Sequence, residues 1–320
     1  MSGASALPLF ALQGQAPTKL LSGLTPAYET TMGAAYIGDS LEVMSKIPDA
    51  SINLVVTSPP YALHFKKAYG NVDASKYVDW FKPFGAEILR ILRDDGSFVL
   101  NISGSWNPGL PTRSVSQYHL LLALVEDVGF HLAQECYWYN PAKLPVPAEW
   151  VTVRRIRIKD AVEHVWWFSK TSSPKANNRN VLRPYSKDML RLNARGVKAA
   201  KRPSGHSIKD TFDKISSGGS IPPNVIEQSD LDNFLVFGNN SANDTYTNRC
   251  KMKGLEIHPA RFPAALPEFF IKFLTDEQDI VLDPFSGSNV VGAVCQAQAR
   301  RWIAVEKSDK YMETSRFRFE

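Results

Sequence analysis

The chain has 320 residues, of which 44% are hydrophobic and 22% charged, a composition typical of a globular protein. No apolar run approaches the ~18 residues of a membrane span, and the amino terminus lacks the basic region of a signal peptide. We therefore expect a cytoplasmic protein with no membrane partner. Cys136, Cys250 and Cys295 form no C-x-x-C pair, which favours reduced, buried thiols and no metal site.

Basic residues are concentrated in the middle of the chain. The net charge is +5, but residues 142–214 contain 17 Lys or Arg against 6 Asp or Glu, a local balance of +11. The rest of the chain therefore carries a net charge of −6. A basic middle on an acidic body favours a polyanionic partner, although a solvated charged surface has the same composition.

The first half of the chain alternates between strand and helix patterns. Ser40 is the predicted N-cap of the first helix, Pro83 interrupts the second, and Gly129 closes the third. We expect the paired tryptophans at 166 and 167 to lie in the core. Strands are predicted at residues 34–40, 52–58, 97–103, 131–140 and 161–170, and helices at 41–47, 77–92 and 117–130.

Residues 171–255 lose this periodicity and are dominated by Ser, Pro, Asn, Gly, Lys and Arg. A helix is predicted again at 262–275, followed by a strand, a turn, a helix and a strand over 279–309. The pattern predicts an α/β fold with one doubly wound sheet, split in sequence by a loop-rich basic insert. We expect an amino-terminal arm (1–30), two sheet-forming parts (31–170 and 256–320) and the insert between them (171–255).

The stretch VVTSPPYALH, residues 55–64, ends a buried strand at two prolines. Consecutive prolines cannot donate hydrogen bonds to a sheet ladder, so the strand must end there. Ligands of open α/β sheets bind in the crevice outside the carboxyl ends of the strands. Ser58 and Tyr61, which flank the prolines, are therefore candidate site residues.

The stretch VLDPFSGSN, residues 281–289, predicts a second part of the site. Its strand ends at Asp283, and Gly287 permits a tight turn before a helix that offers unpaired N–H groups. Glu306 ends the next strand, where an acidic side chain can bind both hydroxyls of a ribose. A G-x-G-x-x-G phosphate loop is lacking, so the loop suits a nucleoside without pyrophosphate, such as S-adenosyl-L-methionine. An ordinary strand–turn–helix connection would look the same.

Together these motifs resemble the amino-methylating DNA methyltransferases. Ser58-Pro59-Pro60-Tyr61 is similar to the cytosine-N4 branch, whereas the adenine-N6 enzymes usually carry Asp or Asn before Pro-Pro. The catalytic motif precedes the cofactor loop, as in the circularly permuted beta class, which includes type II restriction–modification methyltransferases. The resemblance extends from about Tyr36 to Phe319. It implies a Rossmann-like, S-adenosylmethionine-dependent methyltransferase sheet with a target-recognition insert at 171–255.

The resemblance also implies roles for individual residues. Ser58 and the Pro59 carbonyl would accept hydrogen bonds from the N4 amine of a flipped cytosine, and Tyr61 would stack on the base. No side chain is an obvious strong base, and this mechanism requires none. Catalytic residues are Ser58, Pro59, Pro60 and Tyr61; cofactor-binding residues are Asp39, Pro263, Asp283, Pro284, Phe285, Ser286, Gly287, Ser288, Asn289 and Glu306; DNA-binding residues are Lys66, Lys67, Arg154, Arg155, Arg183, Arg202 and His206. Asn289 departs from the family, in which Gly is common at this position.

Two alternatives stay open beside a cytosine-N4 methyltransferase: an adenine-N6 methyltransferase, and an inactive DNA-binding protein of the same fold. A carbon-5 cytosine methyltransferase is excluded, because it needs a thiolate in a Pro-Cys setting and no cysteine here follows a proline. Double-stranded DNA is the expected partner, with activity on the bacterial nucleoid. The sequence does not decide whether the chain forms a homodimer or is paired with a cognate restriction endonuclease.

Overall fold

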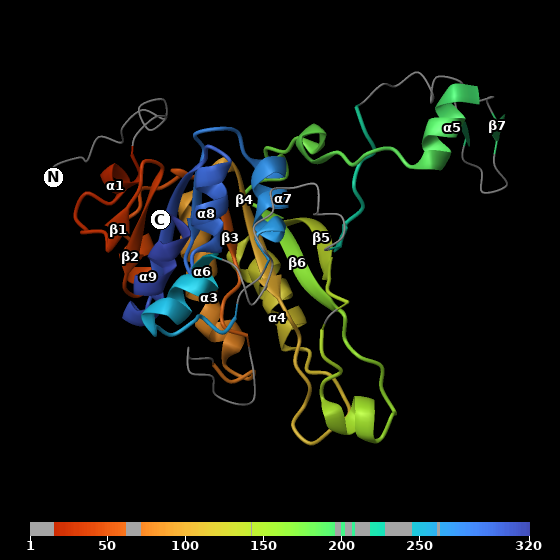
Figure 1. The fold of residues 1–320 in the computed structure, drawn as a ribbon, viewed down its shortest axis with the longest axis horizontal. Helices are drawn as coiled ribbons and strands as arrows, with labels where there is room; N and C mark the ends of the chain where they lie inside the picture. Colours follow the sequence, from red (N-terminus) through yellow and green to blue (C-terminus); the bar gives the residue numbers. More distant parts are fainter. Residues whose placement is uncertain are drawn as a thin grey trace. The chain divides into compact units, whose positions relative to one another are not determined.

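The computed structural model describes residues 16–61, 72–141, 143–195, 200–201, 207–208, 218–227, 245–260 and 263–320. The chain divides into two compact units. One unit comprises residues 1–176 and 224–320, and the other comprises residues 177–223. The larger unit has an α/β fold: a mixed parallel and antiparallel sheet with helices on both faces (Figure 1).

The described part of the larger unit contains a nine-stranded sheet in the order β1-β2-β11-β10-β3-β4-β6-β5-β9. The five strands from β2 to β4 in this order are parallel, and β6 runs antiparallel to β4 and β5. The strands are β1 (Tyr28–Glu29), β2 (Gly33–Ile37), β3 (Ile52–Thr57), β4 (Leu92–Ile102), β5 (His131–Tyr139), β6 (Val162–Ser169), β9 (Val225–Glu227), β10 (Ile280–Asp283) and β11 (Arg301–Glu306).

Alternate residues of these strands enter two separate cores, one on each face of the sheet. Val55 joins one core, whereas its neighbours Leu54 and Val56 join the other. The first core is covered by α1 (Pro17–Leu20), α2 (Ser40–Met44), α3 (Tyr77–Ile91) and α4 (Ser116–Leu122), and the second by α7 (Ala265–Leu274), α8 (Val290–Ala297) and α9 (Asp309–Ser315). Burial on both faces explains why β3 and β10 read as nearly continuous apolar runs.

Four further elements lie in the described part of the larger unit. A π-helix η2 (Ala123–Val128) extends α4, another π-helix, η3 (Glu149–Val153), lies in the connection between β5 and β6, and α6 (Thr245–Lys253) packs against the 3-10 turn η6 (Arg316–Arg318). Among the described residues, none of the helices has the length and apolar character needed to cross a membrane.

The smaller unit contains short elements. They are η4 (Asn178–Val181), α5 (Lys187–Arg195) and the strand pair β7 (Ala200–Lys201) and β8 (Ser207–Ile208). The backbones of Arg183 and Ser220 pair through two hydrogen bonds, at 2.9 and 2.8 Å.

The predicted strands and helices of both sheet-forming parts are confirmed, with three local corrections. Asp39, not Ser40, caps α2, because its carboxylate accepts the Leu41 N–H at 2.9 Å while the Ser40 hydroxyl donates to the Pro284 carbonyl. Helix α3 continues through Pro83 instead of breaking there. Strand β4 begins at Leu92, immediately after α3.

Several details of the sequence interpretation are confirmed. Gly129 ends the helical segment at a φ of +99°, in the left-handed region that glycine enters without strain. Trp166 and Trp167 are buried. All three cysteines are buried free thiols.

The position of β10 creates the site. This strand lies between β11 and β3 although more than 200 residues separate β3 and β10 in sequence. Val281 and Leu282 pair with Leu54 and Val55 in parallel register. The two predicted motifs, which follow β3 and β10, therefore emerge side by side at one edge of the sheet.

We expect Gly33→Ala to destabilise the larger unit. Gly33 lies opposite the buried Trp302 on the neighbouring strand, and a Cβ at Gly33 would stand 2.2 Å from the indole ring. Relieving such overpacking costs about 1–3 kcal/mol. Urea unfolding of the full chain should show this loss. Gly23→Ala is the matched control, because its Cβ would meet nothing within 4 Å; an equal loss in both variants would contradict the packing argument.

Candidate functional site

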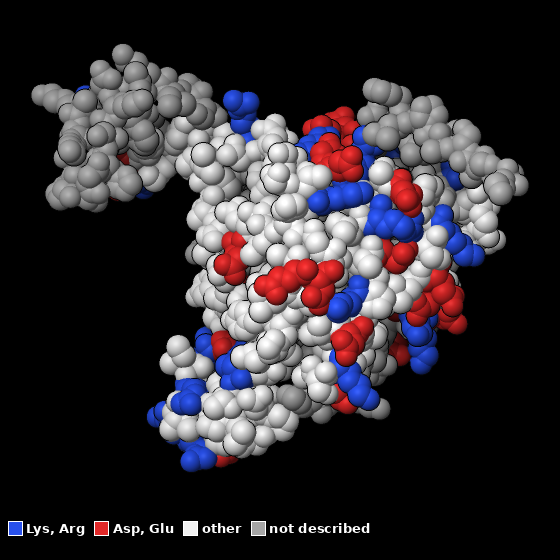
Figure 2. Space-filling view, turned by 180° about the vertical axis from the view of Figure 1, so that it is seen from behind, with Lys and Arg blue, Asp and Glu red and all other residues white. Residues whose placement is uncertain are grey.

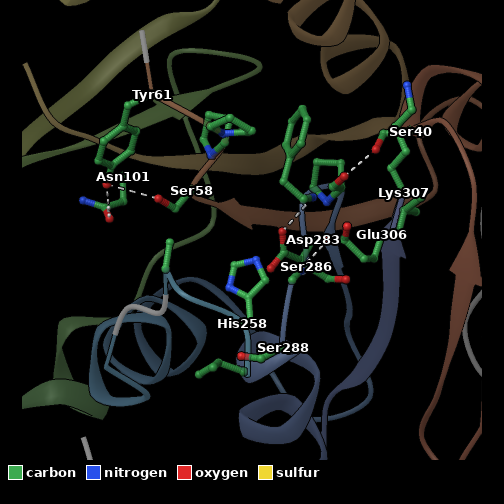
Figure 3. A pocket seen from close by; sticks show the side chains of 18 of the residues that line it. Ser40, Ser58, Tyr61, Asn101, His258, Asp283, Ser286, Ser288, Glu306 and Lys307 are labelled. Atoms are coloured by element: carbon green, nitrogen blue, oxygen red, sulfur yellow. Dashed lines mark hydrogen bonds between the residues drawn. The ribbon is translucent and has the colours of Figure 1, made fainter. Parts of the chain in front are cut away.

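A cavity of about 840 Å³ opens at the carboxyl ends of β3, β10 and β11. Its wall includes all of residues 58–61, 258–260, 283–288 and 305–307. Figure 3 shows Ser58, Tyr61 and Asn101 grouped at one end, and Asp283, Glu306 and Ser40 at the other. The cavity therefore joins the two motifs that the sequence singled out.

Asp283 lies at the floor of this cavity and is 2% exposed. Its Oδ1 accepts hydrogen bonds from the Thr57 hydroxyl at 2.7 Å and from the Phe285 N–H at 3.0 Å. Burial raises the pKa of the Asp283 carboxyl from its ordinary 3.8 to about 7, and the nearby Glu306 also raises it, whereas the two hydrogen bonds lower it. A positive group of a ligand would favour the charged carboxylate here.

The turn after β10 packs closely against the ring of His258 and carries a buried hydroxyl at the cavity wall. Gly287 has a φ of +50°, and the ring of His258 would stand 2.9 Å from a Cβ at this position, so a larger residue would have to displace the histidine. The Ser286 hydroxyl is buried beside the cavity and has no hydrogen-bond partner among the described residues. A bound polar group could satisfy it.

Glu306 and Asp39 complete this end of the cavity. Glu306 Oε2 accepts the Gly287 N–H at 2.9 Å, and its Oε1 accepts the Ser308 N–H at 2.8 Å. Burial raises the pKa of Glu306, and these backbone bonds oppose the rise. A carboxylate offers about four acceptor sites, so Glu306 can still accept a hydrogen bond from a ligand hydroxyl. Asp39 Oδ2 stands 3.7 Å from the Lys307 ammonium, also on the cavity wall.

The opposite end of the cavity is built on the Ser58–Tyr61 turn. The Ser58 hydroxyl donates to Tyr61 Oη at 3.2 Å, and the Tyr61 hydroxyl faces Glu163 Oε2 at 3.0 Å and Asn101 Oδ1 at 3.2 Å. Tyr77 donates to the Pro60 carbonyl at 2.8 Å and so fixes the turn from below. Burial and the Glu163 carboxylate raise the pKa of Tyr61 well above its usual value.

The predicted catalytic residues and most predicted cofactor residues line this cavity. They are Ser58, Pro59, Pro60, Tyr61, Asp39, Asp283, Pro284, Phe285, Ser286, Gly287, Ser288 and Glu306. Pro263 and Asn289 are buried outside the lining. Asn289 Oδ1 caps α8 by accepting the Gly292 N–H at 3.0 Å, and its amide donates to the Tyr28 hydroxyl at 2.9 Å.

The predicted DNA contacts fall into three groups. Arg154 and Arg155 are exposed beside η3 in the larger unit, and Arg183 belongs to the smaller unit. The four others lie outside the described residues, namely Lys66, Lys67, Arg202 and His206.

Sequence reasoning missed Asn101 and Glu163 and did not select His258, for which a surface or hydrogen-bonded role was favoured; all three line the cavity. Asn101 had a usable signal, because it is a polar residue near the carboxyl end of a predicted buried strand. Glu163 lies near the amino end of β6 and reaches this edge only because β6 runs antiparallel to β4. The sequence does not reveal that strand direction.

Comparisons with known proteins find similar sequences over most of the chain. A family model described as a DNA methylase matches residues 52–317. The type II methyltransferase M.PvuII of Proteus hauseri is 48% identical over 93% of this chain and 86% of its own length. The DNA adenine methyltransferase YhdJ of Escherichia coli (strain K12) is 24% identical over 86% of this chain and 79% of its own.

A solved structure is similar over nearly the whole chain. It is described as PvuII DNA methyltransferase (cytosine-N4-specific), with 42% identity and a TM-score of 0.74. The alignment covers 93% of this chain and 90% of that one.

We expect Asp283→Asn to stabilise the ligand-free protein in a pH-dependent way. The folded state holds the carboxyl proton up to about pH 7, whereas the unfolded state releases it near 3.8, so the ionised group costs stability as pH rises between these values. The amide oxygen can still accept from Thr57 and Phe285. The gain over wild type should grow from about pH 4 to pH 7, reaching roughly 2–4 kcal/mol, and then level off.

Urea unfolding of both proteins at pH 5.5, 7 and 8.5 measures this difference. A gain that stays constant over these pH values would show that the pKa of Asp283 is not raised.

Proposed function

The chain belongs to the DNA methylase family, and we propose that it transfers the methyl group of S-adenosyl-L-methionine to N4 of a cytosine in a short double-stranded DNA sequence. The observation that carries this proposal is the shared cavity, in which Ser58-Pro59-Pro60-Tyr61 faces the turn that follows Asp283. The match of the family model over residues 52–317 and the 48% identity to a type II methyltransferase support it.

The residues at the Asp283 end fit the cofactor. S-adenosylmethionine supplies an electrophilic methyl group on a positively charged sulfur. The Asp283 carboxylate, buried and short of positive partners, would bind the amino-acid portion, and the buried Ser286 hydroxyl would gain a partner. Glu306 would accept the ribose hydroxyls with the acceptor sites that its backbone bonds leave, and Asp39 would lie near the adenosine.

The residues at the Ser58 end fit a flipped cytosine. The N4 lone pair of cytosine is conjugated with the ring and is therefore a poor nucleophile. Hydrogen bonds from N4 to Ser58 Oγ and to the Pro59 carbonyl would pull the nitrogen toward sp³ geometry and stabilise the positive charge that develops there. The two prolines, with the Tyr77 hydroxyl on the Pro60 carbonyl, hold these acceptors in place at little entropic cost.

Cytosine-N4 is the target that the comparisons favour over adenine-N6. The enzyme whose structure is described as cytosine-N4-specific has 42% sequence identity to this chain over the aligned region. The adenine methyltransferase has 24%. An inactive binding protein has no comparable support, since Ser58, Asp283 and Glu306 are all present and all line one cavity.

The organisation of the chain around this site belongs to the same proposal. Residues 31–170 carry the catalytic turn, 256–320 the cofactor turn, and 171–255 the target recognition, with 1–30 as an arm. A homodimer and a cognate restriction endonuclease are proposed partners, on the ground that the similar enzymes are type II methyltransferases. The substrate places the activity on nucleoid DNA in the bacterial cytoplasm.

The connection between β5 and β6 forms a lobe, described over residues 140–141 and 143–161, that we propose as a DNA contact. Lys and Arg side chains gather along the outer side of this lobe (Figure 2). Arg154 stacks over the Trp150 ring at 5.2 Å, which holds its guanidinium at the surface. Ile158 is 90% exposed beside these charges. A basic surface with exposed apolar side chains suits a DNA backbone and its grooves.

Nucleoside mass spectrometry is the direct test of the proposed function. Incubating the protein with S-adenosylmethionine and unmethylated bacterial DNA should yield N4-methyldeoxycytidine after complete digestion. N6-methyldeoxyadenosine would identify the adenine branch instead. Ser58→Ala should lower the rate of transfer about 10²–10³-fold, because one acceptor for the N4 hydrogens is lost, with cofactor affinity unchanged.

Ser45→Ala is the matched control, since Ser45 is exposed and bonds only the Glu42 carbonyl of its own helix turn. An unaltered rate in Ser58→Ala would refute the role of this hydroxyl.

Replacing Arg154 and Arg155 by Ala should weaken DNA binding in a salt-dependent way. Each lost phosphate contact should reduce the slope of log K against log salt concentration by about 1. Fluorescence anisotropy with a fixed duplex at several salt concentrations measures this slope. Lys82→Ala is the control. Lys82 lies on α3, outside the lobe and the cavity, and pairs with Asp127 of η2 at 2.8 Å. Equal slopes in wild type, the double variant and Lys82→Ala would show that the lobe does not contact DNA.

A further inference from the structure

A chain of hydrogen bonds runs from the catalytic turn to a carboxylate that the proposed mechanism does not use. The Ser58 hydroxyl donates to Tyr61 Oη at 3.2 Å, and Tyr61 Oη stands 3.0 Å from Glu163 Oε2. The other oxygen of Glu163, Oε1, stands 3.0 Å from the Lys143 ammonium. The Glu163 side chain is only 12% exposed. These groups join the turn after β3 to the start of β6.

The carboxylate end fixes the direction of this chain. An ionised carboxylate only accepts hydrogen bonds, so the phenol proton of Tyr61 must point toward it. Tyr61 Oη then accepts the proton of Ser58, and the lone pairs of Ser58 Oγ remain for the cavity. This is the orientation in which Ser58 can accept an N4–H bond from cytosine.

Asn101 competes for the same phenol proton but cannot replace Glu163. Its Oδ1 lies 3.2 Å from Tyr61 Oη, slightly farther than the carboxylate, and its amide nitrogen donates to the His164 carbonyl at 3.2 Å. A neutral amide forms a weaker hydrogen bond than a carboxylate and does not take up a proton at neutral pH. Asn101 therefore positions Tyr61, and the charged end of the chain is Glu163.

Methyl transfer leaves a proton that must go somewhere. The N4 lone pair forms the new N–C bond, the S–C electron pair stays on sulfur, and the positive charge passes to N4, which still carries two hydrogens. One N4–H bond must then break. On the part of the cavity wall that the structure describes, the carboxylates at the other end, Asp283, Glu306 and Asp39, hold the cofactor in the proposed function.

We propose that Glu163 receives this proton through Tyr61 and Ser58. The N4 proton moves to Ser58 Oγ, the Ser58 proton moves to Tyr61 Oη, and the Tyr61 proton moves to Glu163 Oε2. Methylcytosine and the carboxyl group are both neutral at the end. The Ser58 and Tyr61 oxygens have each exchanged one proton for another, and Glu163 Oε2 has gained one. Tyr61 stays protonated throughout, in keeping with its raised pKa. The Lys143 ammonium lies 3.0 Å from the other oxygen of Glu163 and so fixes the position of this carboxylate.

This inference rests on the proposed function, and the Glu163→Gln variant separates the two. Glutamine keeps the shape of the side chain and can accept from Tyr61, but it cannot take up a proton. We expect the single-turnover rate constant for methyl transfer to fall about 10²-fold, while the Kd values for cofactor and for DNA change less than about threefold. Glu163→Asp should recover part of the rate. Glu126→Gln, the same chemical change at an exposed site, should behave as wild type.

A double-mutant cycle tests the route itself. Tyr61→Phe removes the middle of the relay, so Glu163→Gln should cost little more in that background than Tyr61→Phe alone. If the rate loss of the double variant equals the product of the two single losses, Glu163 acts independently of Tyr61, and the relay is overturned.

An independent measurement needs neither cofactor nor DNA. In protein labelled with ¹³C at tyrosine Cζ, the Tyr61 resonance is identified by its loss in Tyr61→Phe. It should shift in Glu163→Gln and stay in place in Glu126→Gln. An unmoved resonance would contradict the bond between Tyr61 and Glu163, and a wild-type rate in Glu163→Gln would overturn proton uptake. Absence of N4-methyldeoxycytidine from the wild-type reaction would instead refute the proposed function.

Discussion

The hydrogen bond between the Thr57 hydroxyl and Asp283, 2.7 Å long, joins the two halves of the site. It forms because β10 pairs in parallel with β3, which brings the ends of two strands 226 residues apart in sequence to one edge of the sheet. In the proposed function, the catalytic turn continues from Thr57 and the cofactor turn from Asp283. Any shift in the register of these strands would therefore separate the methyl acceptor from the methyl donor, and both cores of the sheet resist such a shift.

The sequence predicted the parts of the structure whose physical causes are local. Two prolines end a strand wherever they occur, and Gly287 marks a tight turn before a helix, so both ends of the cavity could be placed from short stretches. Alternating strands and helices gave the sheet. The predicted N-cap of α2 was wrong by one residue, because the Ser40 hydroxyl donates to the carbonyl of Pro284, which lies 244 residues away in sequence. In the sequence, a serine that caps a helix cannot be distinguished from a serine whose hydroxyl bonds a distant residue.

The remainder of the site depends on pairings that no local pattern encodes. Glu163 enters the cavity because β6 runs antiparallel to β4, with Ile102 opposite His164. His258 lines it because residues 258–260 return to the cavity wall from a part of the chain without clear periodicity. The sequence indicated no strong base near Ser58. Glu163, on the described part of the cavity wall, contacts Tyr61 only because the fold places β6 beside β4.

The central place of β10 also has a consequence for synthesis on the ribosome. A nascent chain that has completed β3 and β4 already contains the whole catalytic turn, but the other edge of β3 has no neighbour until β10 emerges. The basic segment between them is made in the meantime. With the DNA contacts proposed for this segment, affinity for DNA arises before the cofactor turn exists, and a growing chain holds nucleic acid without modifying it. In the proposed function, methyl transfer begins only when β10, whose turn would bind the methyl donor, closes the gap in the sheet.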